Sequence, residues 1–190
     1  TNSNFYYADL SNAHFTNSDM KHARMDWSIT DNAILSTVNL QNIRAPNAHW
    51  RNVKITNSNM NYSNFFGTDF RSSQFTKNSC IHALFERGYF KQANFTDCNF
   101  NDSIFNHANL VHSIWDKCSA RGVEMMHSDL SEIKISESCD FEEANFSYSK
   151  LNGIKAPRAK FIKTIMNHVN IDDGRLAASN LKGALIRFSI

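Results

Sequence analysis

Large hydrophobic residues recur at every fifth position along most of this chain. They occupy nearly every multiple of five from Phe5 to Ile135, and after a shift of one residue they continue from Phe141 to Ile186. We call these positions centres, and 13 of the 15 phenylalanines lie at one. Side chains repeat every two residues along a strand and every 3.6 along an α-helix. A five-residue period therefore favours neither an ordinary sheet nor an amphipathic helix.

A second regular position lies two residues before each centre. It is nearly always small, and Asp or Asn often stands between it and the centre. Alternate residues of a short extended segment face the same side, so both positions are expected to point into a core. Two exceptions support this interpretation. The large Ile43 and Ile154 are paired with the small centres Ala45 and Ala156, which preserves the core volume.

These five-residue units resemble the A(D/N)Lxx units of the pentapeptide-repeat family. Typical units in this chain are Ala8-Asp9-Leu10, Ala93-Asn94-Phe95 and Ala108-Asn109-Leu110. The resemblance covers nearly the whole sequence and implies an all-β fold, a right-handed quadrilateral parallel β-helix. Each unit would form one side and four units one coil, so that about nine coils make residues 1–190 a single solenoid domain. Backbone groups would pair between coils about 4.8 Å apart.

The five-residue frame shifts by one residue between Ile135 and Phe141. One extra residue in a coil predicts a bulge, which we place near residues 136–140. The chain begins with Thr1, and repeats run almost to its last residue with no recognisable capping helix. Because open solenoid ends need covering, we expect a fragment of a longer protein, or a homodimer formed through a side or an open end.

Charge and composition bear on which partners and compartments we expect. The formal net charge is +2, which predicts no specific nucleic-acid binding. Residues 116–143 hold eight acidic and three basic residues, whereas residues 150–187 hold eight basic and two acidic ones. No apolar run approaches the roughly 18 residues of a membrane-spanning helix, so we expect no transmembrane segment. Four cysteines without CxxC spacing favour a reducing compartment, either the cytoplasm or, after secretion, the inside of a host cell.

Candidate catalytic and metal-binding groups are few. The sequence contains no HExxH, GxSxG, Walker-type or GxGxxG motif. Adding 20 residues per coil, or 21 across the frame shift, places Cys98, Cys118 and Cys139 in one inward column. We interpret them as small buried fillers rather than a disulfide or zinc site. Neighbouring carboxylates such as Glu142 and Glu143 lie at outward positions typical of a solvated surface. We therefore expect no enzyme activity, catalytic residue, cofactor or metal.

One corner column gathers aromatic and histidine side chains. Phe5, Met25 and the centre of every fourth unit after them form one side of the predicted β-helix, which we call the first side. Two residues after these centres lie Tyr7, Trp27, Asn47, Gly67, Arg87, His107, His127, Tyr148, His168 and Phe188. Hydrophobic residues also precede some centres of this side. Exposed apolar residues gathered on one side indicate contact with a partner, although a ladder that stabilises the corner itself would use the same residues. The predicted partner-binding residues are Tyr7, Trp27, Leu84, Ile104, His107, His127, Tyr148, Ile165, His168 and Leu185.

Two functions compete for such a rod. The first is a non-enzymatic protein-interaction scaffold, and the loosely patterned units rich in Asn and Phe resemble the β-helices of bacterial secreted effectors. The alternative is a DNA-mimicking, topoisomerase-binding protein of the quinolone-resistance type. That function requires a strongly negative face and usually a C-terminal dimerisation helix, whereas the last third of this chain is basic and its repeats run to Ile186. We favour the scaffold, whose protein partner the sequence does not name.

Overall fold

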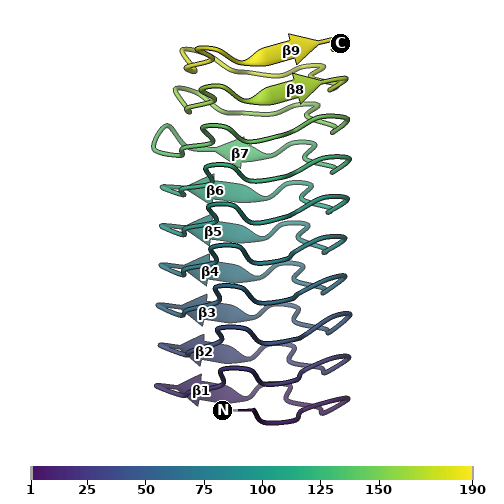
Figure 1. Cartoon of the computed structure of the whole chain (residues 1–190), viewed down its shortest axis with the longest axis vertical. Helices are drawn as coiled ribbons and strands as arrows, with labels where there is room; N and C mark the ends of the chain where they lie inside the picture. The colour runs from purple at the N-terminus through teal and green to yellow at the C-terminus, as the bar shows by residue number, and fades with distance from the viewer. Residues whose placement is uncertain (1, 190) are drawn as a thin grey trace.

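The computed structural model describes residues 2–189 and shows a tall stack of similar coils (Figure 1). The N- and C-termini lie at opposite ends of the stack. Nine short strands recur along the described chain: β1 (His14–Thr16), β2 (Ile34–Ser36), β3 (Lys54–Thr56), β4 (Gln74–Thr76), β5 (Asn94–Thr96), β6 (Ile114–Asp116), β7 (Lys134–Ile135), β8 (Ile165–Asn167) and β9 (Leu185–Arg187). None of the described residues forms a helix long and apolar enough to cross a membrane.

Successive coils lie directly above one another and pair in parallel. β1 to β7 form a seven-stranded sheet along one side of the stack, in which Phe15 lies opposite Leu35. β8 and β9 form a separate pair half a coil away, on the opposite side. Earlier coils are joined on that opposite side by single bridges such as Leu84 to Ile104. The parallel β-helix expected from the sequence is confirmed.

Each corner is built on a residue with a left-handed backbone. Positive φ recurs at nearly every fifth residue, two after each centre, and lies between 49° and 63° for the non-glycine residues. Many corners are β-turns closed by one hydrogen bond; for example, Ala13 N–H donates to the Leu10 carbonyl at 3.0 Å. Asn tolerates this backbone better than most residues. The chain can therefore turn four times per coil with only six glycines.

Asp or Asn before a centre satisfies a corner donor that pairing between coils leaves free. The side chain accepts the backbone N–H two residues later. Asp9 accepts the Ser11 N–H at 2.9 Å, and Asn64 accepts the Phe66 N–H at 3.0 Å. The recurring Ala-Asp/Asn-Leu pattern therefore has a physical cause: the first and third residues fill the core, and the second closes the corner.

Stacked centres fill the interior. Phe65, Phe85 and Phe105 lie above one another with ring centroids 5.3 Å and 4.7 Å apart, and all three are fully buried. Trp115 continues the aromatic core, 4.6 Å from the Phe95 ring. Rings of one coil therefore rest on rings of the next, and the hydrophobic stabilisation runs along the stack.

The frame shift is absorbed at one corner. Ser119 pairs with Asp140, an offset of 21 residues, whereas Asp140 pairs with Lys160 at the usual offset of 20. Exposed residues 137–138 form the enlarged corner, and Cys139 is fully buried again. The structure thus places the extra residue within the stretch where the sequence predicts a bulge, and the core continues past it.

One part of the core holds buried polar atoms without partners. Thr30 occupies a centre one coil before Trp50, and both residues are fully buried. Thr30 Oγ1, Ser28 Oγ and Trp50 Nε1 have no hydrogen-bond partner among the described residues. An unpaired buried polar group costs stability, because it has lost its hydrogen bonds to water.

Replacing Thr30 with Val should therefore stabilise the protein by about 1 kcal/mol, since Val keeps the shape and removes the unpaired hydroxyl. The free energy of unfolding is measured by urea titration. Thr68→Val is the matched control: Thr68 is equally buried, but its hydroxyl donates to the Ala45 carbonyl at 2.6 Å. This control should lose about 1 kcal/mol. Destabilisation by Thr30→Val would contradict the assignment of Thr30 as an unpaired core residue.

Phe95→Ala should cost about 3–5 kcal/mol in the same titration, because it empties a fully buried ring site. Phe66→Ala should cost far less, since Phe66 lies outside the centres and is only half-buried. Equal losses from the two substitutions would show that the five-residue frame is wrong.

Candidate functional site

The predicted contact residues lie along one corner of the stack, which we call the aromatic corner. Its positions are Tyr7, Trp27, Asn47, Gly67, Arg87, His107, His127, Tyr148, His168 and Phe188. All ten have positive φ, between 51° and 65°. The seven aromatic or histidine side chains among them are exposed. A shared backbone conformation therefore presents a series of rings along one edge.

Five of these rings form a continuous ladder in the C-terminal half. The centroids of His107, His127 and Tyr148 lie 5.0 Å and 4.9 Å apart, with interplanar angles of 4° and 6°. His168 and Phe188 follow at 4.9 Å and 5.0 Å, with angles of 9° and 12°. The ladder stabilises its corner, and its outer edges form a flat, partly apolar surface.

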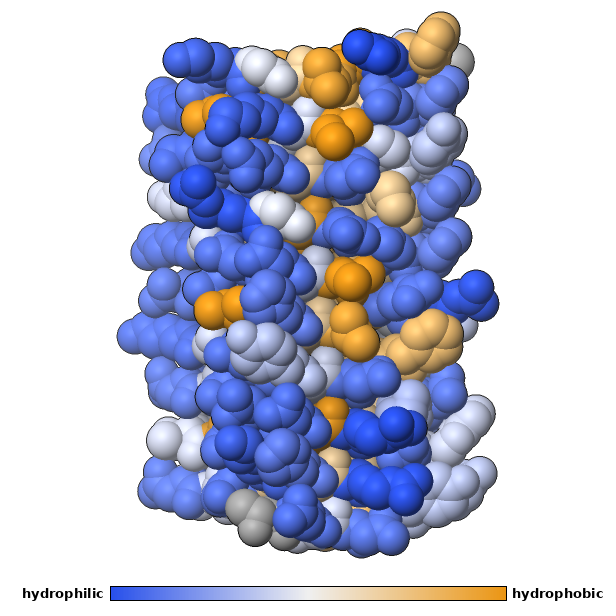
Figure 2. Space-filling view, in the orientation of Figure 1, coloured by the Kyte–Doolittle hydropathy of each residue, from blue (hydrophilic) through white to orange (hydrophobic). Residues whose placement is uncertain are grey.

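Four hydrophobic residues, which we call the hydrophobic strip, lie on the side next to this corner: Leu84, Ile104, Ile165 and Leu185. Leu84 and Leu185 are 38% and 46% exposed. Ile104 and Ile165 are half-buried, less exposed than their outward position predicts, and each pairs with a residue of the coil before it and of the coil after it. Figure 2 shows hydrophobic side chains in a vertical strip on a mostly hydrophilic face.

The hydrophobic strip occupies positions that Asp or Asn fills at many other corners. In the same column Asn64 accepts the corner N–H of Phe66. Hydrocarbon side chains have no acceptor, so Leu84 and Ile104 leave the equivalent N–H groups without this hydrogen bond. At these positions the fold therefore lacks a local stabilising bond and exposes hydrocarbon.

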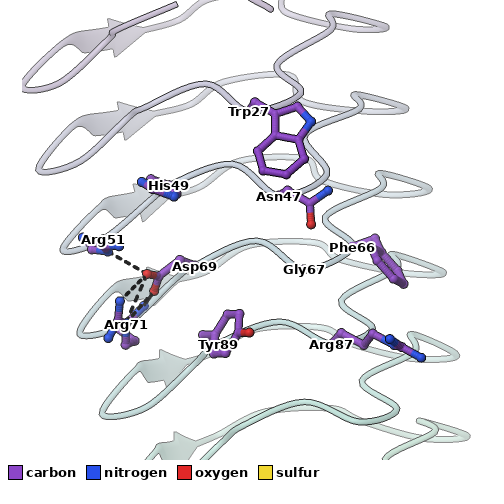
Figure 3. A pocket seen from close by; sticks show the side chains of 10 residues that line it. All are labelled: Trp27, Asn47, His49, Arg51, Phe66, Gly67, Asp69, Arg71, Arg87 and Tyr89. Atoms are coloured by element: carbon purple, nitrogen blue, oxygen red, sulfur yellow. Dashed lines mark hydrogen bonds and ion pairs between the residues drawn. The ribbon is translucent and has the colours of Figure 1, made fainter. Parts of the chain in front are cut away.

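The aromatic corner is interrupted in its N-terminal half. Trp27 and Arg87 are separated there by Asn47 and Gly67, and a hollow of about 500 Å³ opens toward the next side (Figure 3). We call it the corner hollow. The next side contributes His49, Asp69 and Tyr89. Phe66, Arg51 and Arg71 complete its lining.

Asp69 is nearly buried and holds two guanidinium groups beside this hollow (Figure 3). Arg51 Nε and Arg71 Nη2 each donate to Asp69 Oδ2 at 2.6 Å. Burial acts to raise the pKa of Asp69, but the hydrogen bonds from Arg71 and Arg51 outweigh it and lower this pKa. The ionised carboxylate therefore fixes both arginines in place.

The inward cysteine column lies where the sequence predicts it. Cys98, Cys118 and Cys139 are buried, and all are free thiols. Hydrogen bonding to the Cys139 and Cys98 sulfurs, together with burial, raises the pKa of the Cys118 thiol well above its usual range. Across residues 2–189, no group of three or more His, Cys, Asp or Glu side chains is arranged to hold a metal ion.

The repeat can now be compared with known families. The family model described as "Pentapeptide repeats" matches in eight copies, over residues 1–29, 33–71, 73–110 and 139–176. The chain belongs to the pentapeptide-repeat family. The last matched segment begins at Cys139, directly after the corner that holds the extra residue.

Solved structures of two other proteins share this pentapeptide-repeat fold. A trypsin-treated form of QnrB1, a plasmid-mediated fluoroquinolone resistance protein, has a TM-score of 0.78 and 12% identity, covering 91% of this chain and 89% of that one. HetL, involved in heterocyst differentiation regulation in the cyanobacterium Nostoc sp. strain PCC 7120, has a TM-score of 0.56 and 13% identity, covering 95% and 86%. At these identities the likeness shows the fold alone. No curated protein matches the chain.

The structure joins some predicted contact residues and separates others. The ladder rings adjoin the hydrophobic strip, whereas Tyr7 and Trp27 stack 6.3 Å apart at the N-terminal end. The corner hollow was missed from the sequence, although a signal was present. Adding 20 to Arg51 gives Arg71, and Asp69 precedes Arg71 by two residues, so the three share one edge. Contact with a partner stays a prediction for all these residues.

Asp69→Asn should destabilise the protein by about 1–2 kcal/mol at pH 7, because it weakens hydrogen bonds to two charged groups. The folded-state pKa of Asp69 is lowered, so its stabilisation is complete above the unfolded-state pKa of about 3.9 and is lost as pH falls through the folded value. Urea titrations at pH 7 and pH 3 should show a smaller loss on acidification in the variant than in the wild type. Exposed Asp97→Asn is the control. Equal acid sensitivity of wild type and Asp69→Asn would contradict the role of the ion pair.

Proposed function

We propose that this chain is a non-enzymatic scaffold that binds a protein partner through the aromatic corner and the side next to it. The contact surface consists of the hydrophobic strip and the ladder rings. Tyr7 and Trp27 extend it toward the N-terminal end. Rings and aliphatic side chains supply the binding free energy on such a surface, since both release water when covered.

One observation carries this proposal: the hydrophobic strip replaces residues that would otherwise stabilise the corners. Leu84 and Leu185 expose hydrocarbon at positions where Asn64 and Asn145 form structural hydrogen bonds. Such a substitution costs stability in the free protein and is compensated when a partner covers the side chain.

The backbone beneath this surface suits recognition without rearrangement. Leu84 N–H donates to the Ser63 carbonyl at 2.9 Å, and Ile104 N–H donates to the Ala83 carbonyl at 3.0 Å. Each outward residue is thus held by the coil next to it. Little conformational entropy would be lost on binding, which favours affinity.

The proposal assigns no catalytic role to the chain. Glu142 and Glu143 lie close together, but Arg121 binds Glu142 at 2.8 Å and Lys163 binds Glu143 at 2.9 Å. Hydrogen bonding from Lys163 lowers the pKa of Glu143, so this carboxyl is a poor proton donor near neutral pH. These groups support ion pairing between coils rather than acid–base catalysis.

Topoisomerase binding by DNA mimicry has less support. It needs a continuous negative face, but acidic residues of the 116–143 stretch pair with cations of the following coil. Arg158 binds Glu137 at 2.9 Å, and Lys163 binds Glu143 at the same distance. QnrB1 is described as a fluoroquinolone resistance protein, and at 12% identity its likeness supports the shared fold only.

We extend the proposal to a module of the bacterial effector type that works in a reducing compartment. The loosely patterned units rich in Asn and Phe support the effector type. The reducing compartment is supported by four buried free thiols, Cys80, Cys98, Cys118 and Cys139. A second copy of this chain is included among the protein partners, because the same side could meet its own copy.

Photo-crosslinking tests this function. Benzoylphenylalanine replaces His127 in the ladder or, as the control, Gln74 on the opposite β1–β7 side, and each protein is irradiated in an extract of its source or host cell. A discrete adduct should form from position 127 and disappear with excess unlabelled protein; an adduct of twice the mass identifies a second copy. Equal adducts from both positions, or none from 127, would contradict the proposal.

A further inference from the structure

The corner hollow lies where three successive positions of the aromatic corner, Asn47, Gly67 and Arg87, carry no ring. Coils are spaced about 4.8 Å apart, so Trp27 and Arg87 are separated by about 14 Å along the stack. The two intervening positions hold Asn47 and Gly67. A Cβ atom on Gly67 would lie 2.5 Å from Asn47 Oδ1, so the Asn47 side chain rests across the glycine. The gap is therefore open because neither position carries a ring.

Flat hydrophobic groups border this gap. Trp27 and Tyr89 are 48% and 51% exposed, and their rings lie on opposite sides of the opening (Figure 3). Phe66 lies at the rim and is half-buried. A planar side chain entering the gap would meet the Trp27 ring, which lies in the same corner column as the rings that stack in the C-terminal half.

The charge of the corner hollow is positive. Three guanidinium groups and one carboxylate line it, an excess of two positive charges. Arg51 donates to Asp69 through Nε alone, so its terminal N–H groups are available to another acceptor. The Arg87 guanidinium lies 5.8 Å from the centre of the Phe66 ring and forms no ion pair within the described part of the chain. These donors match carboxylates.

We propose that the corner hollow binds an acidic segment of a protein partner, with an aromatic side chain of that segment inserted between Trp27 and Tyr89. Its carboxylates pair with Arg51, Arg71 and Arg87. This inference rests on the proposed scaffold function and adds a specific anchor site and the chemistry of the partner.

Shape and composition favour a protein segment over a small ligand. The hollow is open and shallow, whereas small-molecule sites enclose most of their ligand. Trp, Tyr and Arg are the residue types that dominate binding free energy at protein interfaces. The Asp69 carboxylate holds Arg51 and Arg71 in place before binding, so little side-chain entropy is lost when a carboxylate of the partner pairs with them.

A random peptide library displayed on phage tests this inference with the full chain as bait. Selected peptides should contain Asp or Glu next to an aromatic residue. Fluorescence anisotropy with the most enriched peptide then gives the dissociation constant for each variant. Raising NaCl from about 0.05 to 0.3 M should weaken binding several-fold, because exposed charge pairs are screened.

Two substitutions define the site. Gly67→Tyr fills the gap, and Tyr7 and Tyr148 show that this corner position accepts Tyr at the same positive φ. Gly122→Tyr is the matched control: Gly122 has φ 64°, and its Cβ would also lie 2.5 Å from a side-chain oxygen, Asp102 Oδ1, but at a different corner. Gly67→Tyr should weaken binding at least about tenfold, and Gly122→Tyr less than about twofold.

Arg87→Gln removes an unpaired charge without touching the Asp69 ion pairs, and it should weaken binding by about tenfold. It keeps the inference testable if Gly67→Tyr fails to fold, which circular dichroism reports. Unchanged affinity in Gly67→Tyr and Arg87→Gln, enrichment of peptides without acidic residues, or no enrichment at all would each overturn the inference.

The double variant Ile104→Asp, His127→Asp separates this inference from the scaffold function. Peptides that bind at the corner hollow should keep their affinity for the double variant. Peptides that lose affinity for the double variant but bind Gly67→Tyr normally would overturn the corner hollow as the anchor and leave the scaffold function intact. Conversely, failure of the crosslink from position 127, with binding at the hollow retained, would count against the ladder surface alone.

Discussion

Hydrogen bonds between coils, at a fixed offset in sequence, decide where every side chain of this protein lies. Phe85 N–H donates to the Ile104 carbonyl at 2.7 Å, and Ile104 N–H donates to the Ala83 carbonyl at 3.0 Å, so two bonds tie the coil of Ile104 to the coil before it, and Phe105 N–H donates to the Glu124 carbonyl of the coil after it at 2.7 Å. A slip of one residue would turn the buried centres outward and break these bonds together. The offset of 20, or 21 at the enlarged corner, is therefore rigidly maintained.

Straight columns follow from that constraint, and they bring chemically similar groups together. Rings at the aromatic corner stack because corner positions of successive coils share one left-handed backbone conformation. Arg51 and Arg71 meet around Asp69 for the same reason. A change at one position in a column therefore changes the surface locally: a missing ring at Gly67 opens a hollow, and a hydrocarbon at Leu84 exposes a patch. The proposed contact surfaces lie at such departures from the repeat.

Much of the fold and of the candidate surface was predictable from the sequence, because a core that repeats every five residues leaves a strong signal. The buried centres, the inward cysteines and the corner column all follow from counting. Side-chain conformation does not follow. Half-burial of Ile104 depends on its neighbours in adjacent coils, and Asp69 becomes the partner of two arginines only once the corner is folded. Thr30 departs from the pattern of large hydrophobic centres, but the lack of partners for its hydroxyl, for Ser28 Oγ and for Trp50 Nε1 appears only in three dimensions.

The register across the enlarged corner is the most direct test of this account. His127 lies between His107 and Tyr148 only because the offset is 20 on one side and 21 on the other; an unchanged offset of 20 would place Ser147 above His127 instead. A two-dimensional NOE spectrum of the wild-type protein should show cross-peaks from the His127 ring protons to both the His107 and the Tyr148 rings. Cross-peaks from His127 to Ser147, with none to Tyr148, would contradict the columns on which the proposed surface is built.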